Sequence, residues 1–253
     1  MGKVKELESL EKICAYDKNR GSIGIYLKKF LDSNNISFLR NLWVQHRNLG
    51  LKSLLLDDNL IAAKQHFYTC GKLDEYLILY HDTILLPSRF TIALLSDNTT
   101  LIESYSQLKN SHYELSKKDD GVIFHAMQNV LTDNYEALND NIKTLDTLSK
   151  KNGEWESTFY DCCKLFFIGM TKLEGLKIID ALNQLVDPVF HKKRVLSHTI
   201  DLIATPEAGF AKLAWIKGIH IDIKSYLIPY EMLPIIPNET YHIEYEFLKN
   251  RLK

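Results

Sequence analysis

Hydrophobic and aromatic residues recur at intervals of three and four positions along nearly the whole chain, and the run Leu39, Leu42, Trp43, His46 and Leu49 is a clear example. This spacing places side chains on one face of an α-helix. Alternation with a period of two, which indicates a strand, is scarce and is best developed over residues 218–223. The pattern therefore predicts an all-α protein with little or no β-sheet.

Several helix boundaries carry local signals. We predict a helix that starts after the Asp57-Asp58 pair and ends at Gly71 as its C-cap. Pro87 opens a short helix over residues 87–95, and Asp97 caps the next one, over residues 98–108.

A later helix is bounded in the same way. Thr205 can cap it, Pro206 can occupy its first position, where no N–H donor is needed, and Gly218 ends it. The apolar side chains of this segment predict a helix that packs into the core.

Two helix-turn-helix units stand in tandem. The first covers residues 122–148 with a hinge at 131–134, and the second covers 159–186 with a hinge at 169–172. A register of 38 residues superposes Val130 on Ile168 and Tyr135 on Leu173, although the second helices of the two units are out of register. Such a period is typical of paired helices that stack on their neighbours. We expect stacked antiparallel helix pairs in a TPR-like helical-repeat architecture.

The domain organisation follows from length and composition. A chain of 253 residues can bury a substantial core as one large domain or two modest ones. No Pro/Gly/Ser-rich linker divides the sequence, and the polar stretch 109–121 is the best candidate seam between an N-terminal and a C-terminal half. We predict a single all-α domain over residues 1–253.

Charge and hydropathy limit the classes of partner. The 31 Lys and Arg residues nearly cancel the 32 Asp and Glu residues, so the molecule lacks the positive excess that attracts nucleic acid or anionic membranes. The longest apolar run, residues 165–170, is far shorter than the roughly 20 residues that cross a bilayer. No signal-like segment is found at the amino terminus. We expect a cytoplasmic protein that binds neither nucleic acid nor membranes.

The sequence shows no recognisable catalytic, cofactor or metal motif. His191 and His198 would share a helical face, but two turns separate them by about 10.5 Å, too far to ligate one metal ion. The basic residues 192–194 between them are interpreted as a solvated face. We predict no enzyme and no cofactor, although side chains distant in sequence can converge in space and leave catalysis as an alternative.

The C-terminal stretch has the composition of a protein interface. Residues 225–248 contain four glutamates, five Tyr or Phe rings and no Lys or Arg. Aromatic rings provide large contact area, and carboxylates steer a basic partner. The candidate partner-binding residues are Tyr226, Tyr230, Glu231, Glu239, Tyr241, Glu244, Tyr245 and Glu246. The alternative is that the tyrosines fix this irregular stretch to the preceding helices.

The second half of the chain resembles a known family. The segments that carry the resemblance are 133–138, 173–176, Gly209-Phe210-Ala211-Lys212-Leu213-Ala214, 218–223 and 226–229. Over residues 120–235 they are similar in pattern to the immunity protein 49 family, which comprises predicted all-α bacterial proteins encoded beside secreted polymorphic toxins.

The resemblance implies a stoichiometric inhibitor that binds a cognate toxin and blocks its active site or substrate groove. The acidic, aromatic C-terminal stretch would suit a basic toxin domain, such as one that acts on nucleic acid. The rival hypothesis is a helical-repeat adaptor or regulator that binds a cellular protein or peptide.

Overall fold

The computed structural model describes residues 2–194 and 202–249. Within these ranges the chain forms α-helices and one short 3-10 helix, and it contains no strand. The all-α fold class is confirmed. In chain order the elements are α1 (Gly2–Arg20), α2 (Ser22–Ser33), α3 (Ile36–Leu55), α4 (Leu60–His81), α5 (Pro87–Leu95), α6 (Thr99–Gln107), α7 (Tyr113–Ser116), α8 (Val122–Leu131), α9 (Tyr135–Lys151), α10 (Glu154–Lys172), α11 (Gly175–Leu185), α12 (Pro188–Arg194), α13 (Glu207–Ile216), η1 (Tyr230–Met232) and α14 (Glu246–Lys249).

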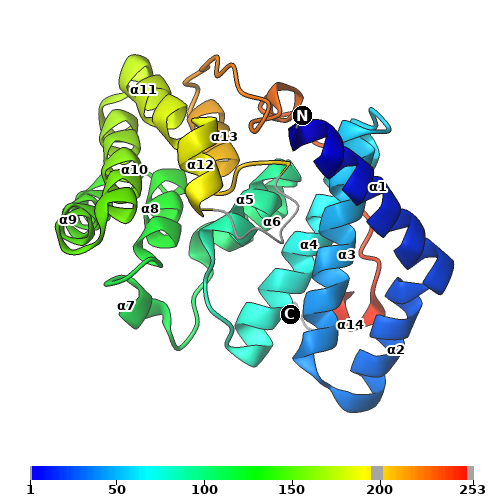
Figure 1. Cartoon of the computed structure of the whole chain (residues 1–253). Helices are drawn as coiled ribbons and strands as arrows, with labels where there is room; N and C mark the ends of the chain where they lie inside the picture. Colours follow the sequence, from blue (N-terminus) through cyan, green and yellow to red (C-terminus); the bar gives the residue numbers. More distant parts are fainter. Residues whose placement is uncertain (1, 195–201, 250–253) are drawn as a thin grey trace.

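The helices form two groups that meet at the centre of the molecule. The long helices α1 to α4 lie on one side, and α8 to α11 lie on the other (Figure 1). Helix α5 packs against α4 and also against α13 and α8. The chain after α13 then returns across the N-terminal helices, and α14 packs against α4 (Figure 1).

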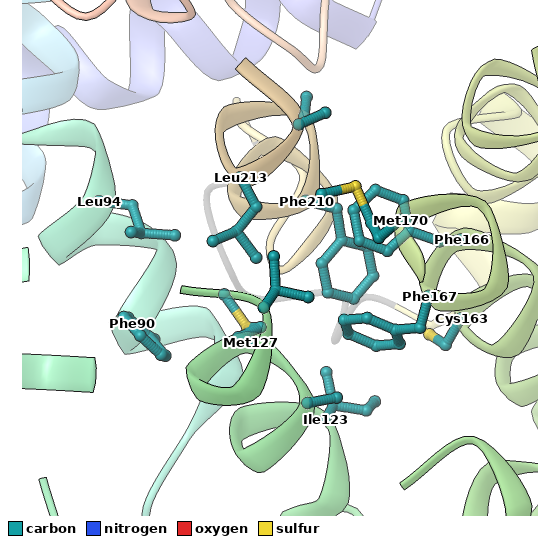
Figure 2. Packing of buried hydrophobic residues seen from close by; sticks show 14 of the residues in the cluster. Phe90, Leu94, Ile123, Met127, Cys163, Phe166, Phe167, Met170, Phe210 and Leu213 are labelled. Atoms are coloured by element: carbon teal, nitrogen blue, oxygen red, sulfur yellow. The ribbon is translucent and has the colours of Figure 1, made fainter. Parts of the chain in front are cut away.

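Aromatic and sulfur-containing side chains fill the C-terminal core. The Phe166 and Phe210 rings stack with centroids 4.6 Å apart, and Phe167 meets Phe210 edge to face at 5.4 Å. Figure 2 shows these rings beside Met127 and Met170, where α8, α10 and α13 converge. Burial of such large apolar side chains is the main favourable contribution to folding.

Apolar packing divides along the central helices. Phe90 and Leu94 of α5 belong to the C-terminal core, whereas Ile92 and Leu95 of the same helix belong to the N-terminal core. One helix thus contributes opposite faces to both cores. The division between these two cores runs through α4 and α5, and the candidate seam at residues 109–121 stays a prediction.

The two predicted helix-turn-helix units correspond to α8 with α9 and α10 with α11, which pack as adjacent helices. The first hinge lies where the sequence indicated. The second was placed too early, because α10 continues through residue 172 and the chain turns at Leu173, which has φ 55°. A Cβ atom on Gly169 would lie 2.7 Å from Ile178 Cγ1, so this glycine permits the close approach of α11. Repetition beyond these pairs stays a prediction.

Three predicted boundaries are wrong. Helix α4 runs unbroken past Gly71, where a Cβ atom would collide with the Leu101 side chain of α6; the glycine serves helix packing and does not end the helix. Asn98, and not Asp97, caps α6, because its side-chain oxygen accepts a hydrogen bond from Leu101 N at 2.8 Å. Thr205 makes no cap for α13, which begins at Glu207 after a cis Thr205–Pro206 bond.

Gly209 provides a test of the contact between α13 and α5. A Cβ atom there would collide with Thr91 Oγ1 and lie 3.0 Å from Thr91 Cβ. We expect Gly209→Ala to lower the free energy of unfolding by about 1–3 kcal/mol, the usual cost of overpacking. Urea unfolding followed by far-UV circular dichroism measures the change.

Gly24 is the matched control. It lies in α2, is exposed, and has no neighbouring atom within 4 Å of a built Cβ. Gly24→Ala should raise stability by about 0.5–1 kcal/mol, because alanine restricts the unfolded chain and favours helix. Equal effects of the two substitutions would show that α13 and α5 are not packed as described.

Candidate functional site

The candidate site is the C-terminal segment, defined here as residues 219–249. Gly218, with φ 76°, turns the chain out of α13. The segment then runs over the body of the protein with only η1 and α14 as regular elements (Figure 1). Pro229, Pro234 and Pro237 lack an N–H donor and keep the intervening stretch out of helix. Residues 219–223 form no strand and no helix, and Ile221 and Ile223 are buried.

A buried ionic cluster holds the middle of this segment. The carboxylate of Asp97 pairs with Lys64 Nζ at 2.8 Å and with Lys212 Nζ. The Lys212 ammonium also donates hydrogen bonds to the carbonyl oxygens of Met232, Leu233 and Pro234 at 2.7, 3.1 and 2.9 Å. Lys64 Nζ donates to the Ile236 carbonyl at 2.6 Å. We call Lys64, Asp97 and Lys212 with these carbonyls the Asp97 cluster.

The two buried lysines of the Asp97 cluster need the carbonyl oxygens of the C-terminal segment as hydrogen-bond acceptors. Asp97 and Lys212 are fully buried, and Lys64 is nearly so. Burial lowers the pKa of the Lys212 ammonium, and the neighbouring Asp97 carboxylate opposes this effect. One carboxylate cannot solvate two ammonium groups, so the carbonyl oxygens of the segment replace the water that the lysines lose.

Two tyrosines fix the segment to the body of the protein. Tyr241 Oη donates to the Ser96 carbonyl at 2.5 Å, and its ring lies 5.0 Å from that of Tyr68. The Tyr245 hydroxyl lies 2.6 Å from His46 Nε2, and only 3% of Tyr245 is exposed. These two of the eight candidate residues hold the segment to the body, as the alternative interpretation stated.

The remaining candidate residues lie at the surface. Tyr226 and Tyr230 are 47% and 51% exposed. Ile235 and Ile236, which lie between η1 and Tyr241, are 45% and 63% exposed. Glu231 and Glu239 are also exposed. We call these residues the exposed tail face: Tyr226, Tyr230, Glu231, Ile235, Ile236 and Glu239.

Glu244 and Glu246 are exposed but engaged. Glu244 lies 3.6 Å from His46 Nε2, and burial raises the pKa of its carboxyl group. Glu246 pairs with Lys249 at 2.8 Å within α14. Glu246 is therefore paired within the protein, whereas Glu244 lies beside an imidazole whose pKa is lowered and which is neutral.

A surface hollow of about 650 Å³ adjoins the exposed tail face. Glu239 and Tyr241 line it on the tail side, and α4 and α6 line the other side. On that side the Glu75 carboxylate accepts hydrogen bonds from Lys72 and Ser104. The hollow is large enough to receive a side chain from a partner.

The structure also shows where the basic residues 192–194 and the four cysteines lie. Lys192 and Lys193 are exposed, as predicted, but Arg194 is not part of a solvated face, because its guanidinium is buried and pairs with Glu207. His198 lies outside the described residues. All four cysteines are buried thiols, and burial raises the pKa of each.

Residues 2–194 and 202–249 contain neither a metal-binding cluster nor a helix that could cross a membrane. No three His, Cys, Asp or Glu side chains lie close enough together to hold a metal ion. No described helix combines the length and the apolar character needed to cross a membrane.

The sequence carried a signal for the Asp97 cluster that motif reading missed. Lys212 stands within an otherwise apolar helical stretch, residues 208–216. A lysine in such a position has to reach solvent or a buried partner.

No family model, curated protein or solved structure matches the chain. The resemblance to the immunity protein 49 family therefore stays a prediction.

The Asp97 cluster predicts a large effect of a small substitution. Asp97→Asn preserves shape but leaves two buried ammonium groups without a counter-charge. We expect the free energy of unfolding to fall by about 3–5 kcal/mol, as for other broken buried ion pairs. Urea unfolding provides the measurement.

Asp140→Asn serves as the control, because Asp140 pairs with Lys143 on the exposed surface of α9. Surface pairs of this kind contribute little to stability. A loss for Asp97→Asn no greater than that for Asp140→Asn would contradict the assigned role of the cluster.

His46 predicts a pH dependence of stability. Burial, aided by the neighbouring His66, lowers the pKa of His46 to about 3. Below about pH 6.5 the unfolded chain takes up a proton at this site and the folded chain does not. Stability should therefore fall with decreasing pH, by about 1.4 kcal/mol per pH unit from this residue alone.

His46→Gln should reduce this slope between pH 6.5 and 4.5, measured from urea midpoints. A residual slope is expected in the variant, because burial also lowers the pKa of His125, to about 4. Identical slopes in wild type and variant would show that His46 is protonated in the folded protein.

Proposed function

We propose that the protein binds another protein through the exposed tail face and acts as an immunity protein that neutralises a cognate toxin. The observation that supports this proposal most is the combination of exposed apolar and acidic side chains on the exposed tail face. Two tyrosines, two isoleucines and two glutamates stand at the surface of a segment that is fixed from within.

Fixation of the segment favours tight binding. A flexible tail would lose conformational entropy on association, whereas a segment already held by Lys212, Tyr241 and Tyr245 loses little. Tyrosine and isoleucine side chains supply contact area, and carboxylates at the edge speed the approach of a positively charged partner.

The charge of the segment favours a basic partner. Residues 225–248 contain no Lys or Arg, and at the surface Lys3 Nζ lies 5.4 Å from the Tyr226 ring. A basic protein surface, such as that of a domain acting on nucleic acid, would complement these carboxylates. The resemblance to the immunity protein 49 family points to the same kind of partner.

The test uses the protein encoded by the adjacent gene as the candidate toxin. Wild type and a Glu231→Lys/Glu239→Lys variant are titrated with this protein by calorimetry. Reversal of two charges at an interface should weaken binding by at least tenfold and reduce its dependence on salt. A Glu136→Lys/Asp180→Lys variant, with the same change of net charge on α9 and α11, should bind like wild type.

Equal affinity of the two double variants would exclude the exposed tail face from the interface. Absence of binding by wild type would favour the rival hypothesis, an adaptor for a cellular protein or peptide.

A further inference from the structure

A second feature lies away from the C-terminal segment, where the two groups of helices meet. A pocket of about 470 Å³ opens between α3, α5, α10 and α12. Its walls come from both cores, since Ile92 belongs to the N-terminal core and Tyr160 to the C-terminal one. This volume is in the range of sites for small organic ligands, which often lie between structural units.

Three arginines line this pocket: Arg47 of α3, Arg89 of α5 and Arg194 of α12. The side chains of Arg89 and Arg194 are only 15% and 10% exposed. The carboxylates in the lining, Asp120 and Glu156, lie nearer the surface. The pocket therefore presents three guanidinium groups at depth, two of them paired with the buried carboxylates of Asp74 and Glu207, and further carboxylates at its rim.

Aromatic rings hold the guanidinium groups in place. Arg89 Cζ lies 5.1 Å from the centre of the Trp43 ring, and Arg47 Cζ lies 5.8 Å from it. Arg194 Cζ lies 4.5 Å from the centre of the Phe159 ring. Stacked guanidinium groups lose little freedom when they bind a carboxylate or phosphate.

Arg89 and Arg194 use only part of their hydrogen-bonding capacity in their pairs with carboxylates. Arg89 donates through Nη1 to Asp74, and Arg194 donates through Nη2 to Glu207. An arginine carries five N–H donors, so each of these pairs uses a fraction of them. The rim carboxylates are already acceptors, Asp120 for Tyr160 Oη and Glu156 for the Gly153 N–H.

We propose that this pocket binds a small organic anion, with a carboxylate or phosphate group against Arg47, Arg89 and Arg194 and a planar apolar part beside Trp155 and Phe159. The deep arginines supply charge and directed donors for the anionic group. Trp155, which is 44% exposed, provides a ring near the mouth for the planar part. This site is independent of the exposed tail face.

Calorimetric titration of the isolated full-length protein tests the proposal with four probes. Phenyl phosphate and benzoate carry both an anionic group and a ring, inorganic phosphate carries only the anion, and benzyl alcohol carries only the ring. We expect phenyl phosphate and benzoate to bind, inorganic phosphate to bind at least tenfold more weakly than phenyl phosphate, and benzyl alcohol to give no heat of binding.

Variants locate the binding. Arg47→Gln should weaken phenyl phosphate at least tenfold, whereas Arg40→Gln, an exposed arginine of the same helix outside the pocket, should leave the affinity unchanged. Trp155→Ala, a partly exposed position whose loss should not unfold the protein, should weaken phenyl phosphate and leave inorganic phosphate unchanged.

Three results would overturn the proposal. They are the absence of binding by every anion at millimolar concentration, equal binding of benzyl alcohol and phenyl phosphate, and equal effects of Arg47→Gln and Arg40→Gln. None of these results bears on the exposed tail face, because no partner protein is present in the titration.

Discussion

The buried carboxylate of Asp97 is the constraint on which the arrangement of the C-terminal segment depends. It joins Lys64 of α4 to Lys212 of α13, two helices that belong to different parts of the chain. Removal of two ammonium groups from water is costly, and one carboxylate offsets only part of that cost. The carbonyl oxygens of residues 232–234 and of Ile236 supply the rest. The backbone carbonyls of the segment thus replace water around the buried ammonium groups of Lys64 and Lys212.

This arrangement separates the two roles of the segment. Its inward-facing groups, such as Tyr241 and Tyr245, satisfy hydrogen-bond partners in the body of the protein. Its outward-facing groups, such as Tyr230 and Ile236, have no comparable role in the core, although they carry large apolar surface. Exposed aromatic and apolar residues on a rigid backbone are what a protein interface requires. That contrast motivates the proposed binding function.

The fold class could be predicted from the sequence because helical periodicity is a local property, and the pairs α8–α9 and α10–α11 were predicted for the same reason. The ends of elements depended on distant residues. Gly71 looks like a cap until Leu101 is seen to occupy the space beside it. Asp97 likewise has the sequence position of a cap, and only the fold brings Lys64 and Lys212 to it.

The candidate site was predictable in part for a related reason. Composition marked the C-terminal segment as acidic and aromatic, but which rings face inward is decided by His46 and by the Ser96 carbonyl, both remote in sequence. The arginine pocket had no sequence signature, since Arg47, Arg89 and Arg194 lie on three helices separated by long stretches of chain. Neither the inward orientation of particular rings nor the arginine pocket can be predicted from residue spacing alone.

Hydrogen exchange of the backbone amides, compared between wild type and Lys212→Met, tests the role of the Asp97 cluster most directly. Methionine keeps most of the side-chain volume but cannot donate to the carbonyls of the segment. Protection of Met232, Leu233 and Ile236, whose amides bond to Pro229 O, Tyr230 O and Asp97 Oδ2, should be lost, while protection in α10 persists. Unchanged protection of these three amides would contradict the account.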